Sequence, residues 1–340
     1  MDNIYRSIMS EYERRRNAAI YDAEARKKHA YETMPQLASV DDEIRKLGLK
    51  YSRSILLSNT QNDAEFAAEE LLCLIEELKN KRGNILMQAG LPDDYYNPQY
   101  KCSTCEDTGY VGKVPYLERC SCFKQQLINA AYRQSNLTSI ENENFDSFDE
   151  KLFSDAVNEE KYGTKKSPRE NILDIKSRCI QFIDNFDAPG GKSLLFSGGA
   201  GVGKTFMSNC IACEILNKGK TVLYQTAPIL FNLINEYKVK CFNNEASDSN
   251  IYNDLFETDL LIIDDLGTET ATNAKITDLF TIINTRILNN SRKSCRTIIS
   301  TNLGIREMLD TYTDRVVSRI GGAFNLYKFI GEDLRNIRNC

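Results

Sequence analysis

The chain has 340 residues, of which 41% are hydrophobic and 27% are charged, and its net charge is −5. The length allows two domains, the composition excludes global disorder, and the negative charge excludes a uniformly basic nucleic-acid binder. A single histidine, His29, excludes a histidine-rich metal site within one chain, and its charged surroundings favour an exposed helix position.

No apolar run reaches the roughly 18 residues that a membrane span needs, and the first residues lack the apolar stretch of a secretory signal. The eleven cysteines are an odd number and too few for a disulfide scaffold. Together these features predict a cytoplasmic protein in a reducing compartment, with no membrane partner.

Residues 1–100 are expected to form a helical, highly charged region that binds a partner. The clearest helix is Asn62–Lys81, and we expect Gly83 to end it. Its apolar side chains fall at three- and four-residue spacing on one face, at Ala67, Leu71, Leu74 and Leu78. This stripe predicts packing against another helix, with a partner-binding face as the alternative.

Residues 101–135 contain four clustered cysteines, which predict a small zinc-binding module. Two close pairs are separated by fourteen residues: Cys102 and Cys105, then Cys120 and Cys122. Four thiolates give Zn²⁺ a closed tetrahedral site, so the metal would be structural rather than catalytic. The second pair is CxC rather than the commoner CxxC, and buried reduced thiols are the alternative.

Residues 136–170 are polar and are expected to be a linker. From about residue 171 the pattern changes, beginning with a helix at Ile172–Phe186. Short apolar runs then alternate with helical stretches; the runs are SLLFS, TVLYQ, DLLIID, RTIIST and LYKFI. This alternation predicts βαβ units and a mostly parallel sheet, so residues 171–340 are expected to form one α/β domain.

The sequence GGAGVGKT, residues 198–205, has the spacing of a phosphate-binding P-loop. It follows an expected strand and opens an expected helix, Thr205–Asn217, which is the context that the motif requires. Lys204 would reach the β- and γ-phosphates, and Thr205 would place its hydroxyl on Mg²⁺. The expected nucleotide-binding residues of this segment are Gly198, Gly199, Ala200, Gly201, Val202, Gly203, Lys204, Thr205 and Phe206.

The sequence LLIIDD, residues 260–265, predicts a buried strand that ends in two carboxylates. Ligands bind at the carboxyl edge of parallel sheets, so this pair would lie beside the P-loop. Asp264 is the expected partner of Mg²⁺ and the nucleotide, and Asp265 is expected to polarise the attacking water.

Three weaker signals follow along the chain. Asn302 ends a strand, where it could orient the water or the γ-phosphate. Arg315 and Arg319 are four residues apart on a short helix and therefore share a face. The segment GEDLR, which includes Arg335, follows the last strand. On the residues alone, ordinary surface positions remain the alternative for each.

Taken together, GGAGVGKT, LLIIDDLGTE, TIISTNL, DRVVSRI and GEDLR resemble, in this order and spacing, the AAA+ ATPases of the DnaC/DnaI helicase-loader family. The related IstB transposition ATPases share much of the pattern. The resemblance covers about residues 140–340, including the segment ENFDSF, and the helical N-terminal region with its cysteine module resembles DnaI-type loaders. It implies an AAA+ P-loop NTPase with a three-layer α/β/α core.

The resemblance also implies roles for individual residues. Asn302 matches sensor I, and Arg335 matches sensor II, which contacts the γ-phosphate in cis. Arg319 matches the arginine finger that enters a neighbour's site, with Arg315 as the alternative. Where many AAA+ proteins have Asp-Glu, this chain has Asp-Asp. Because Asp265 is one methylene shorter than Glu, and because DnaI-like proteins share the substitution, we expect slow turnover rather than inactivity.

The function that the resemblance implies is loading of a ring-shaped replicative helicase onto DNA, with hydrolysis of ATP to ADP and phosphate that is slow without the partner. The expected cofactors are ATP, Mg²⁺ and Zn²⁺, and the expected partners are a hexameric helicase, single-stranded DNA and further copies of the chain. Such loaders contact DNA through the segment that corresponds here to residues 227–255, which contains Lys238 and Lys240; a solvated face is the alternative.

Two other functions compete with this one. An IstB-like ATPase that assists a DNA transposase is the main alternative, but such proteins typically lack a long N-terminal zinc module. A P-loop kinase or GTPase is a weaker alternative. No NKxD signature follows the acidic strand, and a kinase would leave the paired arginines and GEDLR unexplained.

Overall fold

The computed structural model describes residues 2–57, 61–113, 116–131, 143–243 and 249–337. The chain divides into two compact units, one of residues 6–118 and one of residues 119–340 together with residues 1–5. Within the described residues, none of the helices combines the length and the apolar composition needed to cross a membrane.

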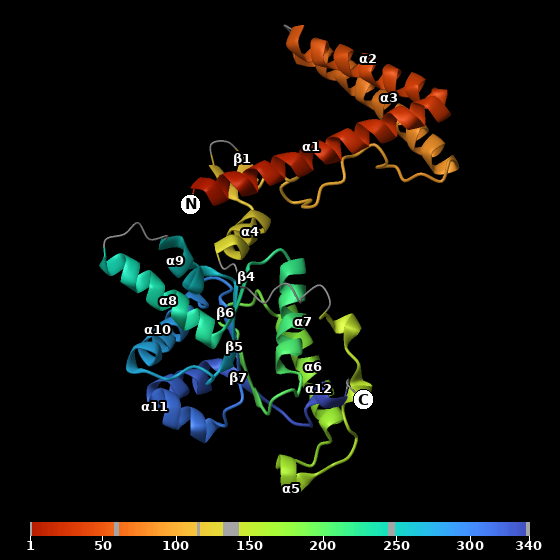
Figure 1. Ribbon diagram of the computed structural model, residues 1–340. Helices are drawn as coiled ribbons and strands as arrows, with labels where there is room; N and C mark the ends of the chain where they lie inside the picture. Colours follow the sequence, from red (N-terminus) through yellow and green to blue (C-terminus); the bar gives the residue numbers. More distant parts are fainter. Residues whose placement is uncertain (1, 58–60, 114–115, 132–142, 244–248, 338–340) are drawn as a thin grey trace. The chain divides into compact units, whose positions relative to one another are not determined.

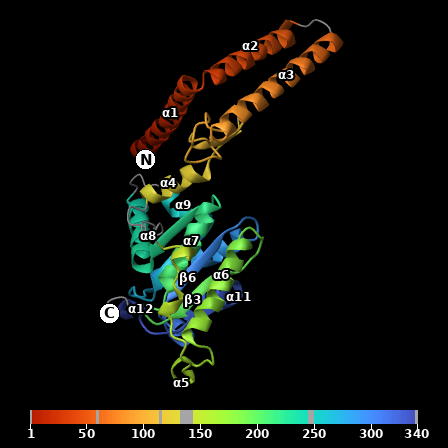
Figure 2. The ribbon, with the colours of Figure 1, turned by 90° about the vertical axis from the view of Figure 1, so that its right-hand side faces the viewer.

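The first unit is built on three long helices, α1 (Asp2–Thr33), α2 (Pro35–Leu57) and α3 (Gln61–Gln88). Helices α2 and α3 lie side by side, as Figure 2 shows. The three helices meet in a small core of Ala30, Leu37 and Leu86. A two-stranded sheet, β1 (Tyr110–Lys113) and β2 (Tyr116–Arg119), follows them.

Helix α3 is longer than the sequence predicts, because it continues through Gly83 to Gln88. A glycine inside a helix costs only about 1 kcal/mol relative to alanine, and the complete burial of Leu86 offsets that cost. The expected apolar stripe is only partly covered, since Leu74 remains 41% exposed. The side chain of Ala67 lies outside the described residues.

The second unit is centred on a five-stranded parallel sheet in the order β4-β5-β6-β3-β7. This confirms the parallel α/β fold that the alternating pattern predicts. The strands correspond to the five apolar runs of the sequence: β3 (Ser193–Gly198), β4 (Val222–Thr226), β5 (Leu260–Leu266), β6 (Arg296–Thr301) and β7 (Phe324–Phe329).

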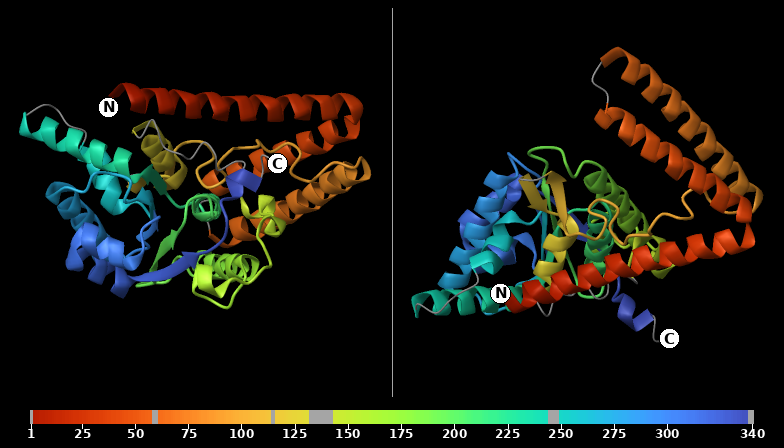
Figure 3. Two further views of the ribbon diagram at one scale, coloured as in Figure 1. Left: turned by 60° about the horizontal axis from the view of Figure 1, so that its bottom comes forward. Right: turned by 90° about the horizontal axis from the view of Figure 1, so that it is seen from above.

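Helices cover both faces of this sheet and give the expected three layers (Figures 1 and 3). Alternate residues of β5 point to opposite faces. Leu260 and Ile262 join the apolar core with α6 and α7, whereas Leu261 and Ile263 join the core with α8 to α11. The helices are α6 (Pro168–Asp184), α7 (Lys204–Asn217), α8 (Ala227–Phe242), α9 (Ser249–Glu257), α10 (Asn273–Asn289), α11 (Ile305–Ala323) and α12 (Leu334–Ile337).

Residues 136–170 are expected to be a linker, but most of those that the structure describes pack onto the second unit. Residues 132–142 lie outside the described residues, but residues 143–170 pack onto the second unit. They form two short 3₁₀ helices (Phe145–Ser147 and Glu150–Leu152), helix α5 (Glu159–Tyr162) and the start of α6. Phe153 is only 6% exposed. This segment is polar on average, but the aromatic side chains spaced along it supply enough apolar surface to pack against the sheet domain.

The expected zinc module, residues 101–135, is not a separate unit either, because helix α4 (Ser121–Ala131) packs on the second unit. The Gln125 side chain accepts a hydrogen bond from Val222 N at 2.8 Å and donates one to Val222 O at 2.9 Å. Val222 belongs to β4, the edge strand of the sheet. Gln125 therefore satisfies strand-edge groups that would otherwise be left unpaired.

Candidate functional site

The P-loop connects β3 to α7 through backbone conformations that favour glycine. Gly198 has φ of 149° and Gly201 has φ of 69°. A Cβ atom at Gly198 would lie 2.4 Å from the carbonyl oxygen of Phe329. Glycine at this position therefore allows the loop to pass close to β7 while its N–H groups remain available to a phosphate.

The Lys204 ammonium group lies at the centre of the loop. Nζ donates hydrogen bonds to Gly198 O at 2.9 Å, Gly199 O at 2.6 Å and Asn302 Oδ1 at 2.7 Å. Lys204 is 5% exposed, and its burial lowers its pKa, while Asp265 acts in the opposite direction. The side chain is thus a largely desolvated cation, and such a cation attracts a phosphate oxygen more strongly than an exposed one does.

Asp264 is buried, and its carboxylate accepts hydrogen bonds from hydroxyl groups on three different elements. Thr205 Oγ1, at the start of α7, donates to Oδ2 at 3.1 Å, and the Tyr224 hydroxyl on β4 donates to the same oxygen at 2.5 Å. The Ser300 hydroxyl on β6 donates to Oδ1. Adjacent hydroxyl and carboxylate oxygens are the ligands that Mg²⁺ prefers, so Thr205 and Asp264 fit this ion.

Asp265 lies in an irregularity of β5. The register between β5 and β6 shifts between Ile263 and Leu266, and Asp265 has a positive φ of 53°. The bulge turns the Asp265 carboxylate into the pocket instead of into a sheet face. Burial and the neighbouring Asp264 raise the pKa of Asp265, with Lys204 opposing them, so this carboxylate accepts a proton more readily than an exposed one does.

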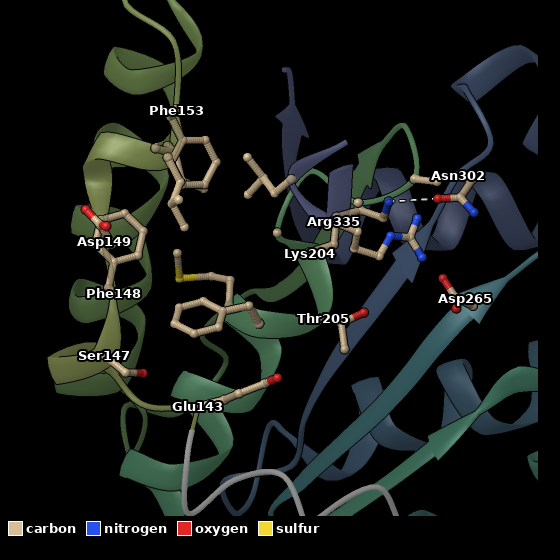
Figure 4. Close-up of a pocket in the computed structure, with 18 residues that line it drawn as sticks. Glu143, Ser147, Phe148, Asp149, Phe153, Lys204, Thr205, Asp265, Asn302 and Arg335 are labelled. Atoms are coloured by element: carbon tan, nitrogen blue, oxygen red, sulfur yellow. Dashed lines mark hydrogen bonds between the residues drawn. The ribbon is translucent and has the colours of Figure 1, made fainter. Parts of the chain in front are cut away.

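A pocket of about 410 Å³ unites these residues, within the size range of small-molecule sites. At one end lie charged and polar side chains, and at the other end lie aromatic ones (Figure 4). Nine of the residues predicted from the sequence line it: Ala200, Gly201, Gly203, Lys204, Thr205, Phe206, Asp265, Asn302 and Arg335. Five predicted residues do not line it, namely Gly198, Gly199, Val202, Asp264 and Arg319.

The aromatic end of the pocket was not predicted. It contains Phe148, Leu152 and Phe153, with Glu143 and Ser147 beside them. The segment ENFDSF contributes much of this wall, and its two phenylalanines, three residues apart among acidic side chains, were the available signal. A flat apolar wall next to a phosphate-binding loop is suited to a nucleobase.

Arg335 reaches the pocket from α12 and pairs with Asp333. Its Nε and Nη2 donate to the two carboxylate oxygens at 3.0 and 2.9 Å. Leu334 N donates to Gly201 O at 3.0 Å, which attaches this segment directly to the P-loop. Figure 4 shows the Arg335 guanidinium group beside Lys204, Asn302 and Asp265.

Arg315 and Arg319 are not brought to this pocket. Both lie on α11 and both are exposed. Neither makes an ion pair with any residue that the structure describes. Their side chains are therefore available to another molecule rather than to the nucleotide site of their own chain.

The segment predicted to contact DNA, residues 227–255, includes residues 244–248, which lie outside the described part of the chain. Lys238 forms an ion pair with Asp278 of α10, and Lys240 is exposed. Of the two predicted cations, Lys238 is thus engaged within the chain, and Lys240 lies at the surface.

The four cysteines predicted to bind zinc lie together. The Sγ atoms of Cys102, Cys105, Cys120 and Cys122 are all within 4.8 Å of one another. Tetrahedral Zn²⁺ with Zn–S bonds of about 2.3 Å requires sulfur separations of roughly 3.8 Å. Small side-chain adjustments would meet this requirement, so the residues fit a possible structural zinc site.

We expect Lys204→Ala to reduce affinity for Mg²⁺–ATP by more than about 100-fold, because the pocket loses the cation that faces the phosphates. Equilibrium dialysis measures this affinity. The exposed Lys192→Ala is the matched control and should bind normally. Unchanged affinity of the Lys204 variant would contradict the assignment.

We expect one zinc ion per chain in protein prepared under reducing conditions with zinc supplied, because four closely spaced thiolates form a closed site. Elemental analysis measures the stoichiometry. Replacing Cys105 and Cys120 with serine should abolish zinc retention, whereas Cys73→Ser, at an exposed cysteine outside the cluster, should not. Equal zinc content in both variants would refute the site.

Comparison with known proteins agrees with this geometry. Residues 154–320 match the family of IstB-like ATP binding proteins. The replicative helicase loader DnaC of Escherichia coli (strain K12) is 30% identical over 151 residues, which is 44% of this chain and 58% of DnaC. DnaC of Buchnera aphidicola is 28% identical over 129 residues, 38% of this chain and 50% of that protein. The chain thus matches little more than half the length of these relatives.

Solved structures similar to this chain include a DnaC helicase loader (TM-score 0.44, 23% identity, 56% of this chain and 98% of that one). They also include DnaI (TM-score 0.40, 20% identity, 48% and 85%). The chain is thus similar to IstB-like ATP binding proteins over residues 154–320 and, over 151 residues, to the replicative helicase loader DnaC.

Proposed function

We propose that this chain is an ATPase that loads a ring-shaped replicative helicase onto DNA. One observation carries the proposal: Lys204, Asp265, Asn302 and Arg335 line a single pocket, in a domain homologous to a helicase loader. The proposed site of action is the cytoplasm, where such a helicase works.

The predicted residues in and beside the pocket each have a role in the proposed hydrolysis. The P-loop N–H groups and Lys204 bind the phosphates, and Asn302 orients the attacking water. Asp265 accepts the proton of that water, and Arg335 contacts the γ-phosphate after exchanging its pairing with Asp333. Thr205 and Asp264 would hold Mg²⁺, which supplies positive charge to the phosphate oxygens.

The proposed helicase-binding surface lies on the first unit. Helices α2 and α3 leave apolar side chains exposed, at Leu49, Leu72, Leu74 and Met87, with exposures from 41 to 75%. Large exposed apolar side chains on neighbouring helices are typical of protein-binding surfaces. We further propose single-stranded DNA as a ligand of the α8 region and self-association through Arg319.

A second candidate is an IstB-like ATPase that assists a DNA transposase, which the match of residues 154–320 to that family favours. The two candidates use the same nucleotide chemistry and differ in the partner. Identification of the partner therefore separates them, and the cysteine cluster favours the loader.

We expect the full-length chain to co-purify with a replicative helicase, and Leu74→Glu to weaken that complex about tenfold because it places a charge in an apolar contact. Biolayer interferometry measures the affinity. Val157→Glu, at a residue of the second unit that is 56% exposed, is the control and should bind normally. Capture of a transposase and not of the helicase would favour the second candidate.

We expect Arg319→Ala to leave ATP binding near normal and to slow hydrolysis, because an arginine supplied by a neighbour stabilises charge that develops only in the transition state. Mixing this variant with Lys204→Ala should restore part of the hydrolysis, since a mixed assembly contains interfaces at which the intact P-loop of one chain faces the intact arginine of the other. No recovery despite demonstrated co-assembly would count against Arg319, and the same mixture with Arg315→Ala tests the alternative residue.

A further inference from the structure

A buried carboxylate joins the loop after β5 to helix α11. Glu269 is 9% exposed and Tyr312 is 1% exposed. The Tyr312 hydroxyl donates to Glu269 Oε1, and Gly267 N donates to Glu269 Oε2 at 3.0 Å. Burial and the adjacent carboxylate raise the pKa of Tyr312, so its hydroxyl keeps its proton and remains a donor. Each oxygen of Glu269 thus binds a different element of the fold.

The loop that contains Glu269 also adjoins two residues of the nucleotide pocket. Gly267 follows Asp265 by two residues, just beyond the bulge in β5. A Cβ atom at Gly267 would lie 2.6 Å from Cδ1 of Leu303, the neighbour of Asn302. A movement of Asp265 or Asn302 on nucleotide binding would therefore shift Gly267 N, which donates a hydrogen bond to Glu269.

Helix α11 is interrupted directly after Tyr312. Thr313 has φ of 73° and ψ of 153°, which divides the helix into residues 305–312 and 314–323. A positive φ is costly for a β-branched residue and marks a place where the direction of the chain is set by its surroundings. The second segment carries Arg315 and Arg319, whose side chains are exposed.

From these contacts we propose that Glu269 and Tyr312 are positioning residues that couple the nucleotide pocket of a chain to the arginine that it offers to a neighbour. Glu269 senses the Asp265–Gly267 loop through one oxygen and holds Tyr312, at the break in α11, through the other. This inference rests on the proposed ATPase function, and it adds the connection between successive sites in an assembly.

The coupling predicts an effect that depends on which chain carries the substitution. Chains with Arg315→Ala and Arg319→Ala have an intact pocket but offer no arginine, and Lys204→Ala chains offer the arginine but have no working pocket. Tyr312→Phe removes only the bridging hydroxyl and keeps the packed ring. Introduced into the Lys204→Ala chain, it should lower the recovered hydrolysis roughly tenfold, since misplacement by about 1 Å can cost about 100-fold.

The matched control is Glu307→Gln, which changes a carboxylate on the same helix that accepts from Gly304 N and does not contact the β5 loop. In the Lys204→Ala chain it should leave the recovered rate unchanged. Tyr312→Phe placed instead in the chain without arginines should have a much smaller effect. Equal recovery with and without Tyr312→Phe in the arginine-donating chain, or equal losses from both positions, would overturn the coupling.

A second measurement needs no turnover. Binding of a non-hydrolysable Mg²⁺–ATP analogue should change hydrogen exchange in residues 314–320 about tenfold, a magnitude typical of coupled sites. In Tyr312→Phe this change should disappear while the analogue still binds. The same change in both proteins, or none in the unaltered chain, would contradict the proposal. If the arginine mixture recovers no hydrolysis even with Tyr312 intact, the proposed arginine supplied by a neighbour has failed, and the exchange result still decides the coupling.

Discussion

The nucleotide site depends above all on the hydrogen bonds that converge on the Asp264 carboxylate. Hydroxyl groups of Thr205, Tyr224 and Ser300 reach it from α7, β4 and β6, so one side chain connects three neighbouring elements at the carboxyl edge of the sheet. A buried carboxylate is stable only when such donors surround it. The bulge that follows it can then turn Asp265 toward the pocket.

The pocket has two chemically distinct ends. The P-loop, Asp265, Asn302 and Arg335 form a charged end, where a developing negative charge can be stabilised. The segment 145–153 forms the apolar end. Asp333 binds Arg335, and the neighbouring Leu334 N bonds to Gly201 O, so the arginine is held beside the P-loop.

The strands and the P-loop could be predicted because their signals are local. A run such as LLIID needs only its own apolar residues to indicate a buried strand, and glycine spacing reveals the phosphate loop. Contacts between distant segments leave no such signal. The packing of Phe148 and Phe153 beside the P-loop, the burial of Leu86 that carries α3 past Gly83, and the bond between Glu269 and Tyr312 each join residues more than 40 positions apart in the chain. Sequence spacing alone therefore missed the aromatic wall, the end of α3 and the link to α11.

We propose that ATP bound in this pocket is used to place a ring-shaped helicase on DNA. A closed circle of single-stranded DNA offers no free end, so a closed ring can enter it only if it is opened. The most direct test incubates the partner helicase with such circles, this protein and ATP, and measures the helicase that co-elutes with DNA in gel filtration. The account predicts efficient loading with the unaltered chain and little with Lys204→Ala. Equal loading without the protein, or with the Lys204 variant, would contradict it.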